Sequence, residues 1–143
     1  MTTIVEALGL RFADLGFGVY KESGQYESYE TGIFLDYMAE TPPNCIVITT
    51  ATGEPADSLQ PYDELRVQIR VRAESPITGR LLAQQIYDDI HGLGPLDVHG
   101  AYLGLSICVE SGPVYDGRDE NKLQHYHVYA DMSVKNPNRR GMS

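Results

Sequence analysis

Apolar and polar residues alternate along the stretch LRVQIRVRAESP, which runs from Leu65 to Pro76. Successive side chains of a β-strand point to opposite faces, so this pattern predicts a strand that is buried on one face only. The apolar positions are Val67, Ile69, Val71 and Ala73, and the polar positions are Arg66, Gln68, Arg70 and Arg72. The apolar face is expected to belong to the core, and the arginines opposite it need another explanation.

A helix is predicted near the N-terminus, from about Thr3 to Leu15. Thr3 and Glu6 have the spacing of a capping box, in which the hydroxyl and the carboxylate bond free amides at the helix start. Apolar residues then recur at the helical period, and Gly16 is a natural terminator. The apolar positions are Ile4, Val5, Leu8, Phe12 and Leu15.

A second helix is predicted directly after the arginine-bearing strand. Ser75 is a favourable N-cap, and Pro76 is well tolerated in a first helical turn. Apolar residues then recur at the helical period as far as Ile90, and Gly92 and Gly94 follow as breakers. The predicted apolar stripe consists of Ile77, Leu81, Leu82, Ile86, Tyr87 and Ile90. This stripe is expected to pack the helix on the sheet.

Further strands are predicted on both sides of the second helix. Before it, the segment GIFLDYM and the β-branched run CIVITT, from Cys45 to Thr50, favour strands. After it, strands are predicted from Tyr102 to Val109 and from Gln124 to Val134. Apolar and polar residues alternate in the last of these, so it too is expected to be buried on one face.

Two turn-rich segments lie between predicted strands. The segment ATGEPADSLQPYDE, from Ala51 to Glu64, is long for a loop without structure of its own. Such loops are often functional, so it is a candidate contact element, with a tolerated surface insertion as the alternative. The segment SGPVYDGRDENK is rich in turn formers and charges and is predicted to be a protruding loop.

These elements predict an α+β fold in a single domain over residues 1–134. Its sheet is expected to be mostly antiparallel, with the N-terminal helix and the central helix packed on it. The length of 143 residues is that of one ordinary domain. Residues 135–143 contain no apolar anchor and are expected to form a flexible polar tail.

Charge and composition narrow the possible partners. The net charge of −9 argues against tight nonspecific nucleic-acid binding, which depends on basic side chains that neutralise phosphates. No apolar run approaches the length of a membrane span, and no signal-peptide pattern opens the chain, so we expect a cytoplasmic protein without a membrane partner. Cys45 and Cys108 lie among apolar residues and are expected to be buried free thiols.

Candidate chemical sites are few. His125, His127 and Asp131 would share one face of the last strand, a set that can bind zinc. Three ligands so close on one strand span a tetrahedron poorly and no fourth follows, so imidazoles paired across strands are the preferred interpretation. The segment DGRDEN, from Asp116 to Asn121, lacks the glycine position and closing glutamate of a calcium loop and is predicted to be a turn. No catalytic motif is present, so neither an enzyme nor a cofactor or metal is predicted.

The arginines of the central strand have two possible roles. They either pair with acids on neighbouring strands, where exposed pairs contribute little, or meet acids on another subunit. Arginine suits the second role because its planar guanidinium binds carboxylates through two hydrogen bonds.

The order of these elements resembles the tail terminator or minor capsid proteins of long-tailed bacteriophages. The resemblance rests on the N-terminal helix, the strand PYDELRVQIRVRA leading into the helix SPITGRLLAQQIYDDIHGL, and the loop and strand SGPVYDGRDENKLQHYHVYADMSV. It is clearest from Leu65 to Val134, and before that only the first helix and CIVITT correspond. It implies a structural virion protein at the head–tail junction, made in the host cytoplasm. Such proteins form a homo-oligomeric ring, typically a hexamer, that caps the head-proximal end of the tail tube and contacts the head connector.

A ring of this kind closes through a heterologous contact, in which one patch meets a different patch on the next subunit. The arginine face is a candidate for one half and the acidic loops for the other. The candidate interface residues are Arg66, Arg70, Arg72, Glu54, Asp57, Asp63, Glu64, Asp116, Arg118 and Asp119. The remaining acids would line a lumen that repels DNA phosphates, so that DNA passes through without binding.

Two alternative functions stay open. A head-to-tail connector or tail-completion protein shares the size, the order of elements and the ring habit. A small ligand-binding or enzymatic α+β domain would instead enclose a pocket near His125, His127 and Asp131. A flat or convex surface at these residues would count against the latter.

Overall fold

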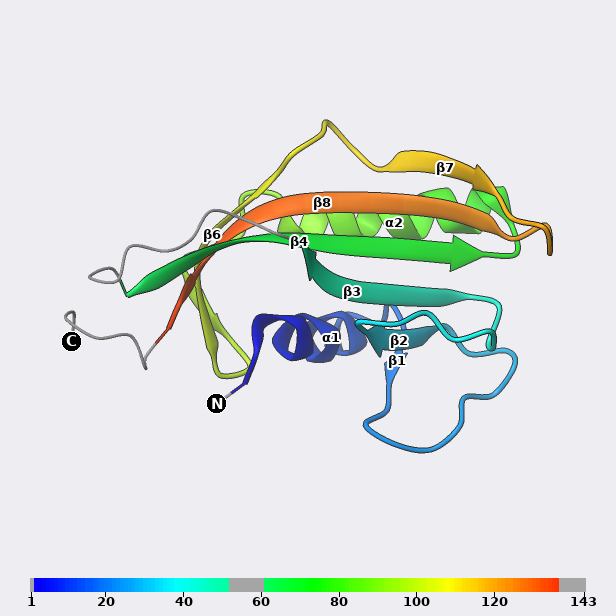
Figure 1. Ribbon diagram of the computed structural model, residues 1–143, viewed down its shortest axis with the longest axis horizontal. Helices are drawn as coiled ribbons and strands as arrows, with labels where there is room; N and C mark the ends of the chain where they lie inside the picture. Colours follow the sequence, from blue (N-terminus) through cyan, green and yellow to red (C-terminus); the bar gives the residue numbers. More distant parts are fainter. Residues whose placement is uncertain (1, 52–60, 137–143) are drawn as a thin grey trace.

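The structure is a computed structural model that describes residues 2–51 and 61–136 (Figure 1). Within these residues the chain forms two helices and one sheet of eight strands. The elements are α1 (Ile4–Asp14), β1 (Val19–Tyr20), β2 (Gly32–Leu35), β3 (Cys45–Ala51), β4 (Tyr62–Ala73), α2 (Pro76–Ile90), β5 (Leu96–Val98), β6 (Ala101–Cys108), β7 (Val114–Arg118) and β8 (Gln124–Lys135).

The long strands β4 and β8 form the centre of the sheet. They pair antiparallel along their whole length, from Tyr62 opposite Lys135 to Ala73 opposite Gln124. The strand order is β1-β2-β3-β4-β8-β6-β5, and β7 pairs with the part of β8 that β6 does not reach. The pairs β1–β2 and β2–β3 are parallel and the other pairs are antiparallel. The predicted α+β fold with a mostly antiparallel sheet is confirmed.

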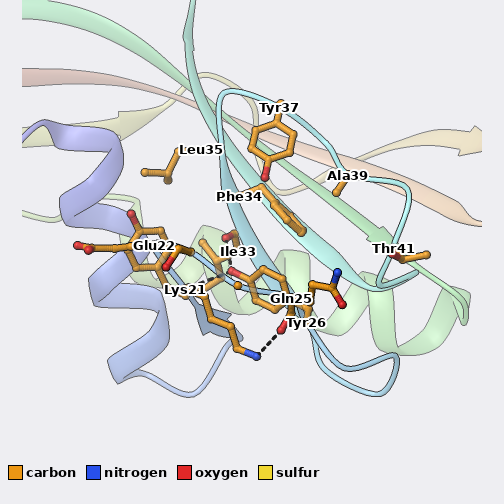
Figure 2. A pocket seen from close by; sticks show the side chains of 13 residues that line it. Lys21, Glu22, Gln25, Tyr26, Ile33, Phe34, Leu35, Tyr37, Ala39 and Thr41 are labelled. Atoms are coloured by element: carbon orange, nitrogen blue, oxygen red, sulfur yellow. Dashed lines mark hydrogen bonds between the residues drawn. The ribbon is translucent and has the colours of Figure 1, made fainter.

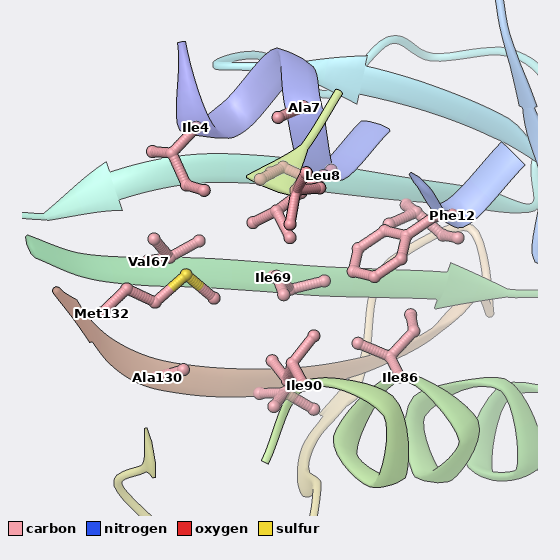
Figure 3. Packing of buried hydrophobic residues seen from close by; sticks show 14 of the residues in the cluster. Ile4, Ala7, Leu8, Phe12, Val67, Ile69, Ile86, Ile90, Ala130 and Met132 are labelled. Atoms are coloured by element: carbon pink, nitrogen blue, oxygen red, sulfur yellow. The ribbon is translucent and has the colours of Figure 1, made fainter. Parts of the chain in front are cut away.

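Both helices cover the same face of the sheet, which we call the inner face; the opposite one is the outer face. Helix α1 contacts β1, β2 and β3 and also β5, at the other end of the strand order, so the sheet curls around it. Helix α2 packs on β4, β6 and β8. Figure 3 shows Leu8 and Phe12 of α1 and Ile86 and Ile90 of α2 on either side of Ile69 of β4, within one cluster of buried residues. The apolar core between the helices and the sheet holds the fold together.

Both helices begin at the predicted caps. The Thr3 hydroxyl accepts a hydrogen bond from the backbone N–H of Glu6 at 3.4 Å, and the Ser75 hydroxyl accepts from the second residue of α2 at 3.2 Å. Helix α1 ends before Gly16, whose φ of 80° lies in the left-handed region that glycine adopts without strain. Leu15, predicted to join the apolar side of the helix, is instead 46% exposed because it lies beyond the last helical turn.

The buried side of α2 differs from the predicted stripe. The buried residues of the helix are Gly79, Ala83, Ile86 and Ile90. At Gly79 the helix approaches the sheet so closely that an added Cβ would lie 2.7 Å from the Tyr126 ring. Small residues thus face the sheet in the first half of the helix, and Ile77 and Leu81 point away, with exposed fractions of 79% and 58%. The prediction that these two side chains belong to the core was wrong.

Two segments predicted as loops carry strand structure. Ala51 and residues 62–64 of the candidate contact loop belong to β3 and β4, and residues 52–60 lie outside the described residues. The predicted protruding loop contains β7, which pairs with β8. Of the turn predicted from Asp116 to Asn121, the first three residues belong to β7, and a turn follows at Asp119, whose carboxylate accepts two backbone N–H bonds. The predicted tail lies outside the described residues from residue 137 onward.

A bulge in strand β6 changes which face of the sheet the following side chains point to. Leu103 is fully buried on the inner face, and the register with β8 shifts between Leu103 and Leu105. One extra residue in a strand moves the following side chains to the opposite faces, so the small Ser106 and Cys108 become the buried residues. The outward-facing residues after the bulge are Leu105, Ile107 and Val109, which are 45%, 44% and 44% exposed.

A smaller apolar cluster lies on the outer face, where Phe34, Cys45 and Val47 are buried under the segment that connects β2 to β3. Cys45 and Cys108 are both buried and unpaired, which confirms the prediction of free thiols. Burial raises the pKa of each thiol, for Cys108 to about 11. Neither of the two described helices has the length and apolar character that crossing a membrane requires.

Candidate functional site

The outer face brings together the arginines of β4 and the histidines of β8. In the antiparallel register, Arg70 lies opposite His127 and Arg72 opposite His125. The arginine pattern and the histidine pattern, predicted separately from the sequence, therefore belong to one surface. The three arginines have different surroundings within it, and each is described in turn.

Arg66 forms an ion pair within the sheet. Its Nε and Nη2 donate to the two carboxylate oxygens of Asp131, opposite it on β8, at 2.9 and 3.3 Å. This hydrogen-bonded carboxylate raises the pKa of Arg66. The side chains are 41% and 58% exposed, so water screens the pair and its contribution to stability is small. Pairing with a neighbouring strand, one of the two predicted roles, is thus found for Arg66.

Arg72 is buried, with an exposed fraction of 7%. Its guanidinium donates hydrogen bonds to four backbone carbonyls, those of Ala39 (2.6 Å), Glu40 (3.1 Å), Pro42 (2.9 Å) and Pro43 (2.9 Å). These bonds hold the β2–β3 segment on the outer face. Arg72 was expected to meet a carboxylate on a strand or on another subunit, and the structure corrects this, since carbonyls of its own chain occupy the guanidinium.

Arg70 has no such partner. It lies between Val47 of β3 and His127 of β8. Its Nε is buried and makes no hydrogen bond within the described residues, and its guanidinium forms no ion pair there. A buried donor without an acceptor costs about 1 to 3 kcal/mol. Arg70 is therefore the arginine of β4 whose bonding capacity is unused within the described part of the subunit.

The two histidines of β8 are bound by separate carboxylates. His125 Nε2 lies 2.8 Å from a carboxylate oxygen of Asp119, and this hydrogen bond lowers the pKa of Asp119. His127 Nδ1 lies 2.8 Å from Asp116, and its Nε2 lies 3.1 Å from Glu110. The two imidazoles thus pair with carboxylates of β7 and of the segments on either side of it.

The histidines and Asp131 do not converge on a common point. Asp131 binds Arg66, and the described residues contain no group of three His, Cys, Asp or Glu side chains arranged to hold a metal ion. The predicted arrangement on one strand face is present, but each side chain is turned toward its own partner. Within the described residues, each of these side chains therefore has its own partner, and the three are not arranged to bind one metal ion.

The remaining interface candidates among the described residues lie at both ends of the β4–β8 pair, Asp63 and Glu64 at one end and Arg118 at the other. Glu64 accepts a hydrogen bond from the Ser133 hydroxyl at 2.9 Å, and Asp63 accepts one from the Asn136 side chain at 3.1 Å. Arg118 ends β7, next to the turn at Asp119. Glu54 and Asp57 fall outside the described residues.

A cleft of about 490 Å³ lies beside β2, between residues 20–26 and residues 37–41 (Figure 2). Its wall is held by Tyr26, whose hydroxyl accepts from the backbone N–H of Lys21 and donates to the carbonyl of Ile33, both at 2.9 Å. Neither histidine of the outer face lines this cleft. The ligand-binding alternative predicted a pocket at those histidines, and this cleft lends it no support.

Two apolar surfaces were not foreseen from the sequence. One is the exposed side of α2 with Ile77 and Leu81, and the other is the outward row Leu105, Ile107 and Val109 after the bulge in β6. Gly79 and Ala83, the small residues that face the sheet, are a possible signal for the first. Gly104, next to the register shift, is a possible signal for the second.

Comparison with known proteins yields one family. A family model described as bacteriophage tail terminator protein matches residues 12–136, from within α1 to the residue after β8. A comparison with curated proteins gives no significant match.

Proposed function

Because the chain belongs to the family of bacteriophage tail terminator proteins, we propose that it forms a homo-oligomeric ring, a hexamer, that caps the head-proximal end of the tail tube and contacts the head connector. The family makes the chain a structural protein of the phage tail. The observation that carries the proposal is the extent of the match, which covers residues 12–136 and therefore nearly every described element.

Arg70 supports the outer face as one half of the contact between subunits. Arg66 and Arg72 bond within their own subunit, whereas Arg70 has no acceptor among the described residues. A carboxylate of the next subunit would satisfy the guanidinium with charge-assisted hydrogen bonds. A ring closes through two different patches on each copy, so this carboxylate would come from another surface of the same chain.

The charge of the chain supports a ring through which DNA passes without binding. The net charge is −9, and tight nonspecific DNA binding depends on cationic side chains that release counterions from the phosphates. An acidic ring lumen repels the phosphates and leaves the duplex free to move.

The alternative functions have less support. A connector or tail-completion protein is a neighbouring role in the same assembly, but the matching family model describes terminators. An enzymatic or ligand-binding domain would use His125, His127 and Asp131, and these side chains bind Asp119, Asp116, Glu110 and Arg66 of the same chain instead.

Electron microscopy of the purified protein, alone and mixed with purified tail tubes, tests the proposal. We expect rings with a central hole that bind one end of each tube, and sedimentation velocity gives the number of copies. Tubes without the added protein are the control. A protein that remains monomeric and leaves both tube ends bare would contradict the proposed function.

A further inference from the structure

The exposed side of α2 forms one wall of a shallow apolar groove. The groove has a volume of about 460 Å³ and is lined by Pro76, Ile77, Arg80, Tyr115, Gln124 and Tyr126. We call it the α2 groove. Ile77 is 79% exposed at its edge, and Leu81, one helical turn further, is 58% exposed on the same side of the helix. Large side chains left in water at neighbouring positions are typical of a surface that a partner covers.

The second apolar surface is the row Leu105, Ile107 and Val109, which we call the β6 row. Each of these side chains is close to half exposed, and the bulge in β6 turns them all to the outer face. The alternation places small buried residues between them, so the row is continuous along the strand.

These two surfaces cannot meet within one subunit. Helix α2 covers the inner face of the sheet, whereas the β6 row lies on the outer face. Two apolar surfaces on opposite faces of the same molecule can cover each other only between copies. Such a contact is heterologous, and its repetition builds a ring when the rotation between neighbouring copies closes.

Charge at the two surfaces is complementary. In the α2 groove, the Arg80 guanidinium lies 5.2 Å from the centre of the Tyr126 ring and donates only to a backbone carbonyl, that of Pro113, at 3.5 Å. It forms no ion pair within the described residues. The β6 row is bordered by the carboxylates of Glu110, next along the chain, and Asp131, opposite Ile107 on β8. Glu110 contacts His127 and Asp131 binds Arg66 in the same subunit, and both carboxylates remain 43% and 58% exposed, so each keeps oxygens open to a further donor.

We propose that the α2 groove of each copy receives the β6 row of the next copy, with Arg80 facing Glu110. The inference rests on the proposed function, because it assigns the surfaces that build the proposed ring. The occupant is a second copy of this chain, since the apolar row and the carboxylate that the groove requires are both present on the chain itself.

Two single variants and their mixture test the pairing. Leu81→Glu changes the groove side and Ile107→Glu changes the row, and each wild-type side chain is partly exposed, so circular dichroism should report an unchanged fold. Each variant alone should sediment as a monomer under conditions where the wild type forms rings. In a mixture, one intact groove and one intact row remain, so heterodimers should form and rings should not. Tyr29→Glu, at a site 81% exposed outside both surfaces, should still form rings.

A second pair of variants keeps the test decisive if an apolar replacement disturbs the fold. Arg80→Glu should weaken the ring, and the double variant Arg80→Glu with Glu110→Arg should restore it in part. Rings formed by both Leu81→Glu and Ile107→Glu would overturn the inference and leave the proposed function standing. Self-association of Ile107→Glu alone would also overturn it, because the groove would then pair with itself. A wild-type chain that neither forms rings nor binds tube ends would overturn the inference and the proposed function together.

Discussion

Replacing Arg72 by methionine is expected to destabilise the protein strongly, although Arg72 forms no ion pair with a carboxylate of the described residues. Methionine keeps an unbranched apolar stem and removes the guanidinium. The four carbonyls that now accept from Arg72 lose their donor, and the β2–β3 segment loses its attachment to the outer face. The apolar cluster beneath it, with Phe34 and Val47, then becomes accessible to water.

The size of the effect follows from the burial of these bonds. The bond to the Pro42 carbonyl is buried, and the others are partly buried. An unsatisfied buried carbonyl costs about 1 to 3 kcal/mol, and each bond whose acceptor regains water costs roughly 0.5 to 1 kcal/mol. We therefore expect Arg72→Met to lower the free energy of unfolding by roughly 3 to 5 kcal/mol, a large share of the 5 to 15 kcal/mol typical of one domain.

Arg66→Met is the matched control, because Arg66 lies on the same face of the same strand and loses an exposed ion pair. Its cost should stay below about 1 kcal/mol. Urea denaturation followed by circular dichroism measures both free energies under the same conditions. If the two variants differ by less than about 1 kcal/mol, the carbonyl cluster does not stabilise the fold as argued.

Three further predictions concern assembly, acid stability and thiol reactivity. Arg70→Gln removes no bond seen within the described residues, so the free energy of unfolding should change by less than about 1 kcal/mol. The ring of this variant should nevertheless dissociate at a higher protein concentration than the ring of Arg66→Gln. Sedimentation of an unaltered ring would count against the role of Arg70. The hydrogen bond from His125 lowers the pKa of Asp119, so this carboxylate stabilises the fold above its ordinary pKa and the gain is lost as the pH falls through the lowered value. Asp119→Asn should therefore melt below the wild type near neutral pH, with the gap closing in acid, and a constant gap would contradict this. Burial raises the pKa of Cys108 to about 11, so iodoacetamide should alkylate the native thiol far more slowly than the unfolded one at mildly alkaline pH, and equal rates would refute this.

The elements that the sequence predicts well are those specified by neighbouring residues. The caps at Thr3 and Ser75 act over one turn of helix, and both helices begin where these residues predict. The alternation from Val67 to Ala73 identifies the inner face of β4 because no bulge interrupts that strand. Strands β1 and β5, with two and three residues, are too short to carry a periodic signal and exist through their pairing.

The role of each arginine could not be predicted from alternation alone. The pattern places Arg66, Arg70 and Arg72 on one face, and the structure confirms this placement. What each one binds depends on the neighbouring chain: a carboxylate on β8 for Arg66 and the carbonyls of the β2–β3 segment for Arg72. These partners lie 29 to 65 residues away in the sequence, where no local pattern indicates them.

The two apolar surfaces arise where α2 and β6 depart from simple periodicity, and both departures leave large apolar side chains exposed. Gly79 brings α2 so close to Tyr126 that small residues fill the contact, and Ile77 and Leu81 are left outside. The bulge in β6 buries Ser106, whose hydroxyl has no hydrogen-bond partner within the described residues, while Ile107 faces out. Each arrangement costs an isolated subunit burial energy, at about 25 cal/mol for each Å² of apolar surface left in water. A chain that keeps both surfaces regains this energy if copies cover them, which is the physical reason to seek the subunit contact there and not at the arginine face alone.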